Sequence, residues 1–324
     1  MIRRYCLMGL VAGATTARRA PGQQRSKPAR VAILTFGSPE APYLDALKVG
    51  LRDLGWVENS DVVFEIRAIR GQFDRMPALV KETVASSPDV IWAIDTATAV
   101  LCKQATSTIP IVFAGSADPI GAGLVQSLSR PGGNATGQLN HLADLGPKLL
   151  ELLHSIVPGL SRVAALVSPH NPVVAQAATQ ALQAAGAHLK LVLVPFSATT
   201  ANEIDQAFAR MKLERIDGLV IPEGAVYVLA RQQIGELLIR HRIAAAVSLR
   251  ELLRGALVSY GDNALRRVRD SATYLDKILR GTKPADLPVE QPMRLELVVN
   301  LQTAKALGLA VPQSLLLRAD EVVG

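Results

Sequence analysis

The sequence predicts an α/β protein of two doubly wound parallel-sheet lobes joined by a multi-strand hinge. Its 324 residues are enough for two domains of roughly 150 residues each. Hydrophobic residues make up 49% of the chain and aromatic residues only 4%, a mixture typical of buried parallel strands that alternate with helices. In addition, the chain presents the same order of predicted strands and helices twice.

The repeat begins with two similar apolar strands, RVAIL at 30–34 and RVAAL at 162–166. Each is followed by a helix that we expect to end at a glycine, Gly55 in the first copy and Gly186 in the second. Equivalent positions of the two copies are 128 to 134 residues apart. This near-constant spacing indicates a duplicated unit. Because right-handed crossovers force β-α units into parallel sheets, the sequence predicts two similar lobes.

The later elements of the two copies follow in the same order. The predicted strands span 61–69, 89–94 and 109–115 in the first copy, and 188–196, 217–222 and 243–247 in the second. We divide the chain into a leader at 1–28, a first lobe at 29–137 with a return segment at 259–286, and a second lobe at 138–258 with a C-terminal segment at 287–324.

The positive charge of the chain is concentrated at its start. Seven of the 35 basic residues lie in residues 1–30, which hold no acidic residue. The remainder of the chain therefore contains 28 basic and 28 acidic residues. A neutral folded part argues against a nucleic-acid partner. The leader carries Arg3-Arg4 and an apolar stretch from Cys6 to Ala17, shorter than the roughly 20 residues of a membrane-spanning helix. We expect a Sec or twin-arginine export signal; a disordered cytoplasmic leader is the alternative.

The sequence holds no recognisable catalytic or cofactor motif. It lacks a phosphate-binding G-x-x-x-x-G-K-[ST] loop, a G-x-S-x-G nucleophile elbow, an H-E-x-x-H zinc motif and the G-x-G-x-x-G dinucleotide pattern. The five histidines are scattered, and Cys6 and Cys102 do not have the spacing of a zinc site. We therefore expect no cofactor, no metal and no catalytic residue.

A ligand site is expected where the two sets of strand-end loops face each other, since ligands of open parallel sheets lie beyond the carboxyl ends of the strands. These loops carry hydroxyl, carboxylate, amide and aromatic side chains suited to a small organic ligand. The candidate ligand-binding residues are Thr35, Phe36, Ser38, Tyr43, Asp95, Thr96, Thr98, Ser116, Asp118, Ser168, His170, Asn171, Glu223, Tyr227, Ser248, Tyr260 and Asp262.

Several candidates also have an ordinary structural interpretation. Asp95 or Thr96 would cap the following helix, and Asp118 and Glu223 would be solvated loop carboxylates. Tyr43 would be a helix core residue, and His170 a solvated loop residue. Each alternative stays open at the level of the sequence.

Four long stretches resemble the tryptophan-binding-protein-like periplasmic components of ABC transporters. They are QATSTIPIVFAGSADPIGAGLV at 104–125, SLSRPGGNATG at 127–137, YLDKILRGTKPADLPVEQP at 274–292, and LVVNLQTAKALGL with ADEVV at the end. The resemblance covers about 30–324 and implies a type I periplasmic-binding fold. It implies capture of a small solute, an amino acid or an aromatic or carboxylate compound, for delivery to an ABC permease with its ATPase.

The sequence departs from this family at the predicted site. The first strand-end loop is shorter than usual, and AAAVSLRELL at 244–253 lacks the usual Tyr-Pro-Trp, with Ser248 in its place. The favoured function is a periplasmic, monomeric binding protein that closes by a hinge. The alternatives are a racemase- or transferase-like enzyme on paired lobes, and a ligand-sensing regulatory domain of the same fold.

Overall fold

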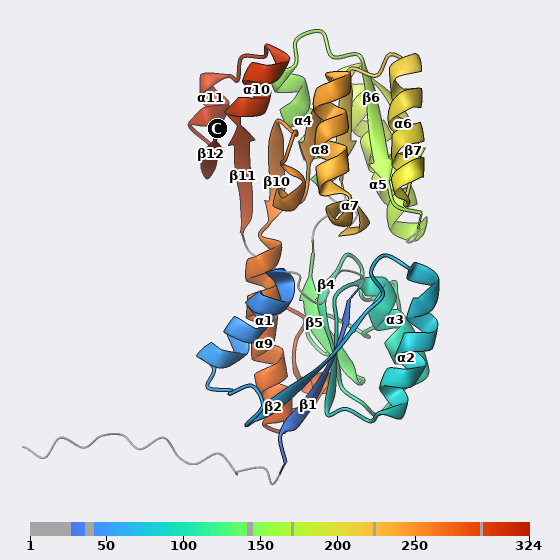
Figure 1. Ribbon diagram of the computed structural model, residues 1–324, viewed down its shortest axis with the longest axis vertical. Coiled ribbons are helices and arrows are strands. Elements are labelled where there is room, and N and C mark those ends of the chain that lie inside the picture. Colours follow the sequence, from blue (N-terminus) through green and yellow to red (C-terminus); the bar gives the residue numbers. More distant parts are fainter. Residues whose placement is uncertain (1–26, 36–41, 141–144, 170–171, 223–224, 292–293) are drawn as a thin grey trace, which may run out of the picture.

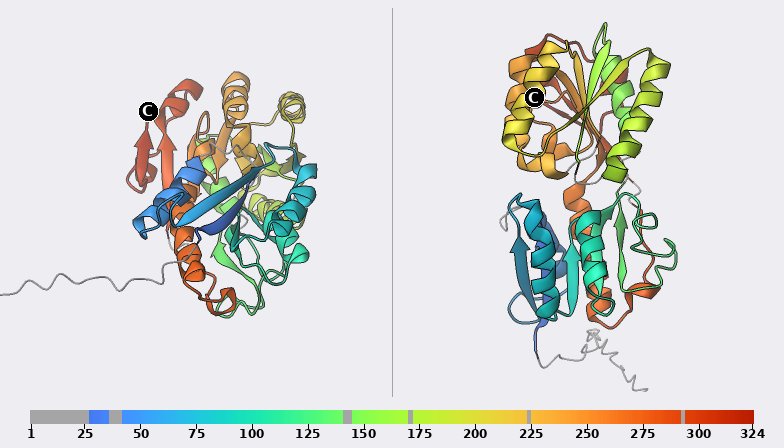
Figure 2. Two further views of the ribbon diagram at one scale, coloured as in Figure 1. Left: turned by 60° about the horizontal axis from the view of Figure 1, so that its bottom comes forward. Right: turned by 90° about the vertical axis from the view of Figure 1, so that its right-hand side faces the viewer.

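The computed structural model describes residues 27–35, 42–140, 145–169, 172–222, 225–291 and 294–324. Two lobes lie one above the other, and each contains a sheet with helices on both of its faces (Figure 1). Figure 2 shows the same layering from two further directions. The predicted fold of two parallel-sheet α/β lobes is confirmed.

The first lobe contains a five-stranded parallel sheet in the order β2-β1-β3-β4-β5. Its strands are β1 (Ala29–Thr35), β2 (Val62–Ala68), β3 (Val90–Ala93), β4 (Ile111–Ser116) and β5 (Ala135–Leu139). Its helical segments are α1 (Pro42–Asp53), η1 (Phe73–Arg75), α2 (Met76–Ala85), α3 (Thr96–Ala105), α9 (Ala264–Leu279) and η4 (Pro284–Asp286).

The second lobe contains a seven-stranded sheet in the order β12-β11-β10-β9-β8-β6-β7, in which β11 runs antiparallel to β10. Its strands are β6 (Arg162–Val167), β7 (Val192–Ser197), β8 (Gly218–Ile221), β9 (Ala244–Val247), β10 (Val258–Asp262), β11 (Leu295–Asn300) and β12 (Glu321–Val323). Its helical segments are α4 (Gly146–Ile156), α5 (Pro172–Leu189), α6 (Ala201–Leu213), α7 (Ala225–Leu229), α8 (Arg231–His241), η3 (Arg250–Leu252), α10 (Leu301–Leu307) and α11 (Gln313–Leu316).

The predicted duplication is visible in the strand order. The run β2-β1-β3-β4-β5 in the first lobe has the same connectivity as β7-β6-β8-β9-β10 in the second. The strands β1 and β6, which both contain Arg-Val-Ala, occupy equivalent positions within their sheets. The strands β11 and β12 extend the second sheet beyond the repeat.

The lobe boundaries differ from the predicted ones by a few residues. Strand β10 pairs with β9 and β11, so 259–262 belong to the second lobe and the return segment begins after Asp262. Conversely, Leu287 and Val289 are buried in the cores of the first lobe, so the C-terminal segment enters the second lobe only with β11. Strand β5 continues to Leu139 in the first sheet, past the predicted boundary at 137.

Helix α5 is longer than predicted. It passes through Gly186 and ends at Leu189, so the strand expected from 188 begins only at Val192. A Cβ on Gly186 would collide with the side chain of Leu193 on β7. This glycine therefore allows close packing inside the helix instead of ending it, whereas Gly55 follows α1 with a φ of +93°, as expected for a helix stop.

The return helix α9 belongs to the core of the first lobe. It packs along α1, and its residues Val268, Ala272 and Leu275 are buried in the core cluster of that lobe. A Cβ on Gly50 of α1 would collide with the carbonyl oxygen of Arg269, so the two helices approach each other closely. The chain thus passes between the lobes after β5, after β10 and before β11, which gives a junction of three segments.

Candidate functional site

The carboxyl ends of the parallel strands in the two lobes face each other. Contacts between the lobes come from segments that follow these strand ends. The hydroxyl of Tyr43, after β1, donates a 2.9 Å hydrogen bond to Glu251, after β9. Phe73, after β2, packs against the cores of both lobes. The two sets of loops therefore meet across one space, as the repeat predicts.

A cavity of about 530 Å³ lies between the lobes at one side of this space. The first lobe contributes Arg70, Gly71 and Phe73, and the second lobe contributes residues that include Thr199 and Leu229. A volume of this size matches a small organic ligand, since such pockets measure roughly 300 to 1,000 Å³. Apolar and charged side chains both line it.

The start of α3 joins four of the candidate residues. Asp95 caps the helix, and its side chain accepts a 2.8 Å hydrogen bond from the backbone N–H of Thr98. The hydroxyl of Thr96 donates to that of Ser116 at 3.0 Å, which connects α3 to the end of β4. Thr98 and Ser116 are buried. The capping interpretation of Asp95 is confirmed, while a ligand contact there stays a prediction.

A group of buried and half-buried polar side chains lies at the junction of the three crossing segments. We call Tyr43, Asn140, Ser248, Glu251, Asp262 and Arg267 the junction cluster. The guanidinium of Arg267 on α9 forms a 2.5 Å ion pair with Asp262 and donates a 2.7 Å hydrogen bond to the carbonyl of Ala114. Both side chains of the pair are nearly inaccessible, at 9% and 2% exposed.

Gly115 is required for this arrangement, because a Cβ there would collide with the guanidinium of Arg267 and crowd Asn140. Burial raises the pKa of Tyr43, and the neighbouring Glu251 carboxylate adds to the shift. Tyr43 therefore remains a neutral hydrogen-bond donor throughout the physiological pH range.

Four atoms of the junction cluster are buried yet lack a hydrogen-bond partner among the residues that the structure describes. They are Asn140 Oδ1, Ser248 Oγ, Glu251 Oε2 and Asp262 Oδ1. An unpartnered buried polar atom costs about 1–3 kcal/mol, so native proteins keep few of them. Three carbonyl or carboxylate oxygens and one hydroxyl are thus available to a ligand with suitable donors.

The other candidate residues differ in burial and in location. Thr35 and Ser168 are buried at the ends of β1 and β6. Tyr260 is half-buried on β10, opposite Leu297 of β11. Tyr227 is fully buried in the core of the second lobe, where it has no exposed surface in this conformation.

Asp118 is exposed and accepts a 2.8 Å hydrogen bond from the backbone N–H of Gly121, so it stabilises a turn outside the junction cluster. The candidates Phe36, Ser38, His170, Asn171 and Glu223 lie outside the described residues.

Sequence reasoning missed three residues of the junction cluster, Asn140, Glu251 and Arg267. Arg267 lies in a helix rich in exposed arginines, and only the packing of α9 under β4 distinguishes it. Asn140 directly follows strand β5, and Glu251 lies in η3, shortly after β9. Their positions after strand ends were the sequence feature that could have identified them.

Within the described part of the chain, no group of three or more His, Cys, Asp or Glu residues is arranged to hold a metal ion. In the same part, no helix is both long and apolar enough to cross a membrane.

Comparison with known proteins identifies the family. The family model described as ABC transporter substrate binding protein matches residues 31–323. The chain belongs to this family. The resemblance seen in the sequence is thus confirmed, and the substrate-binding protein is a component of an ABC transporter.

Similar proteins agree with this assignment. The substrate-binding protein is 25% identical over 275 residues to a tyrosine-binding protein from Clostridioides difficile, which covers 83% of this chain and 79% of that protein. A structure of an ABC domain in complex with L-Trp from Streptococcus pneumonia has a TM-score of 0.83 at 24% identity, covering 92% of this chain and 100% of that chain.

A conserved domain protein from Vibrio cholerae is also similar, with a TM-score of 0.79 at 27% identity. The match covers 91% of this chain and 100% of that chain. These likenesses show the type I periplasmic-binding fold that the sequence resemblance implied.

Proposed function

We propose that this substrate-binding protein captures an amino acid between its lobes and delivers it to a membrane permease. The observation that carries the proposal is the junction cluster, in which buried acceptors and a buried guanidinium lie together between the lobes. Asn140 Oδ1 and Glu251 Oε2 are acceptors without a partner in the described part of the chain, and they suit an ammonium group. The hydroxyl of Ser248 and the guanidinium of Arg267 suit a carboxylate.

An aromatic side chain on the ligand is the preferred choice. Phe73 lines the inter-lobe cavity, and Tyr43 is a half-buried member of the junction cluster. The tyrosine-binding relative and the relative with bound L-Trp support the same class of ligand. Ring surfaces of protein and ligand gain from mutual burial and from specific geometry.

Closure of the lobes follows from the division of the ligand contacts between them. Tyr43 and Arg267 belong to the first lobe, while Ser248 and Glu251 belong to the second. A ligand that contacts all four binds the closed arrangement better than an open one, and this difference shifts the equilibrium toward closure. The three crossing segments act as the hinge.

We also propose that the protein carries out no covalent step. Cys102, the candidate thiol, is fully buried on α3, and burial raises its pKa to about 12. The carboxylate of Asp95 contributes to the same shift. The thiol therefore stays protonated at neutral pH and is a poor nucleophile or base.

Export to the periplasm, a monomeric state and the lack of a nucleic-acid partner belong to the same proposal. They rest on the basic leader with its short apolar stretch and on the equal number of acidic and basic residues after residue 30. Fractionation of a tagged chain and light scattering of the purified protein test the first two points.

Calorimetric titration with L-tyrosine and L-tryptophan tests the ligand class. Each amino acid is compared with its N-acetyl and its amide form, which lack the ammonium and the carboxylate. We expect binding to require both groups, and Glu251→Gln to weaken it at least about tenfold. Glu151→Gln, at an exposed position on α4, is the control and leaves the affinity unchanged.

The proposal fails if no free amino acid binds, or if the N-acetyl and amide forms bind as well as the parent compound. Mass spectrometry of the ligand recovered after incubation tests the absence of turnover, and a chemically altered ligand would restore the enzyme alternative.

A further inference from the structure

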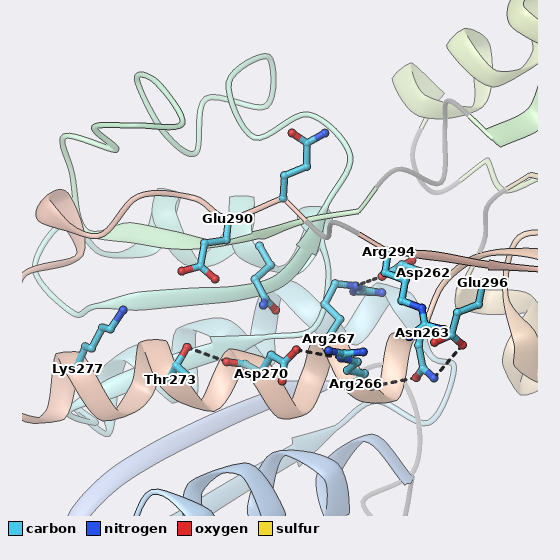
Figure 3. A pocket seen from close by; sticks show the side chains of 12 residues that line it. Asp262, Asn263, Arg266, Arg267, Asp270, Thr273, Lys277, Glu290, Arg294 and Glu296 are labelled. Carbon is cyan, nitrogen blue, oxygen red and sulfur yellow. Dashed lines mark hydrogen bonds and ion pairs between the residues drawn. The ribbon is translucent and has the colours of Figure 1, made fainter. Parts of the chain in front are cut away.

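A second cavity lies at the junction, between α9, the end of β5 and the segment that leads into β11 (Figure 3). We call it the hinge cavity. Its volume is about 490 Å³, large enough for a small organic molecule. It shares only Asp262 and Arg267 with the junction cluster. Its remaining lining residues do not line the inter-lobe cavity.

The most buried lining residues present unpartnered acceptors. Gln138 of β5 is 7% exposed and Asp262 of β10 is 4% exposed. Gln138 Oε1 and Asp262 Oδ1 are buried, and neither has a hydrogen-bond partner within the described segments. The other carboxylate oxygen of Asp262 is already occupied by Arg267. Two buried acceptors without a donor favour an occupant that supplies hydrogen-bond donors.

The rim of the cavity carries mixed charge. The lining holds four acidic and four basic side chains. Figure 3 shows Glu290 and Lys277 directed toward the cavity from opposite walls, one from the connecting segment and one from α9. Both residues are exposed, and neither takes part in an ion pair among the described side chains. The Glu290 carboxylate attracts a cationic occupant, and the Lys277 ammonium on the opposite wall offsets part of that attraction.

A singly charged organic cation fits these groups better than a metal ion. Calcium requires six to eight oxygen ligands, whereas the described residues of the buried lining offer two free side-chain oxygens. The charge of Asp262 is already compensated by Arg267, so the buried lining lacks the uncompensated negative charge that a divalent ion needs.

We propose that the hinge cavity is a second binding site, which takes a small primary amine with its ammonium group on Gln138 and Asp262. The alkyl part of the amine extends toward the mouth of the cavity. The hinge cavity shares Asp262 with the junction cluster but lies outside the inter-lobe cavity, and its occupant need not be the transported ligand.

The walls of this site come from both lobes, so occupancy depends on the lobe angle. Gln138 and Lys277 belong to the first lobe, whereas Asp262 and Glu296 belong to the second. An amine bound at the hinge therefore favours one lobe arrangement. Where the proposed amino-acid function holds, the amine alters amino-acid affinity, and the amino acid alters amine affinity by the same factor.

The test is calorimetric titration of the full chain with butylamine, with butyrate as the matched probe that lacks an ammonium group. We expect butylamine to bind and butyrate not to bind. Gln138→Met keeps the size of the side chain but removes the acceptor, and should weaken amine binding at least about tenfold. Glu290→Gln, at an exposed position, should weaken it about twofold to fivefold.

Two further variants locate the amine. Asp286→Asn removes an exposed carboxylate from the same connecting segment outside the cavity and should leave the affinity unchanged. Ser248→Ala alters the junction cluster and should also leave butylamine binding unchanged.

The inference is overturned if the wild-type protein does not bind butylamine, if butyrate binds equally well, or if Ser248→Ala abolishes binding while Gln138→Met and Glu290→Gln do not affect it. The titration needs no amino acid, so a failed amino-acid panel leaves this result intact.

Discussion

The two sides of the inter-lobe space differ in how their polar groups are satisfied. At the start of α3 in the first lobe, Asp95 caps the helix and Thr96 is bonded to Ser116. At the end of β9 in the second lobe, Ser248 Oγ and Glu251 Oε2 are buried without a partner among the described residues. The first set holds its own loop in place, while the second set retains bonding capacity for a ligand. Strand-end position alone therefore does not distinguish a structural group from a binding group.

The largest expected effect concerns the buried ion pair at the junction. Arg267→Ala leaves the Asp262 carboxylate buried and uncompensated, which should cost about 3–5 kcal/mol of unfolding free energy. Urea denaturation followed by circular dichroism measures this loss.

Arg269→Ala is the matched control on the same helix. Its pair with Asp53 is about half exposed, so its loss should cost no more than about 1 kcal/mol. Equal losses for the two variants would show that the junction pair has no special role.

The next effect concerns the hydrogen bond that joins the lobes. Tyr43→Phe removes the donor to Glu251, and the closed arrangement should lose about 1.5–3 kcal/mol, because the acceptor is a carboxylate. X-ray scattering of the free protein should show a larger radius of gyration.

Tyr260→Phe serves as the control, since Tyr260 lies on β10 and its hydroxyl forms no hydrogen bond with the described residues of the opposite lobe. An unchanged scattering profile for Tyr43→Phe would mean that this bond does not contribute to closure.

The two lobes also differ at a helical glycine that allows close packing. Gly50→Ala on α1 meets the carbonyl oxygen of Arg269, a backbone atom that cannot move alone, and should cost about 1–3 kcal/mol. Gly186→Ala on α5 meets the flexible end of Leu193, which can shift, and the helix gains stability from losing a glycine. We expect a near-neutral change there. Thermal unfolding of both variants checks this order, and a larger loss at Gly186 would contradict it.

The smallest effect is a pH dependence at the start of α6, where Thr200 and Glu203 form a capping box. Hydrogen bonds from the backbone N–H groups of Thr199 and Thr200 lower the pKa of Glu203 from 4.5 to about 2. Because the folded pKa is below the unfolded one, the stabilisation is complete above about pH 4.5 and is lost as the pH falls toward 2.

Melting temperatures of the wild type and Glu203→Gln should therefore differ at neutral pH and converge between about pH 4.5 and 2. A difference that stays constant over this range would exclude the carboxylate as its source.

Much of the fold could be predicted from the sequence because it depends on local patterns. The apolar runs RVAIL and RVAAL became β1 and β6, and the Thr200 and Glu203 spacing became a capping box. The duplicated order of strands and helices then left few possible topologies, since the crossover connections between parallel strands are right-handed. Local spacing could not predict the close contact between Gly186 and Leu193, because it depends on how α5 packs against β7.

The candidate site was only partly predictable for the same reason. The sequence by itself determined that polar residues such as Asp95, Ser116 and Ser248 lie at or just after strand ends. It also determined that the protein has two sheets with such an edge. Only the tertiary structure decided that Arg267, on a helix far along the chain, lies under β4 beside Asn140 and Asp262. It also decided which polar groups are bonded internally. Periodicity is a property of neighbouring residues, whereas burial and pairing depend on segments more than 100 residues apart, such as Ala114 and Arg267.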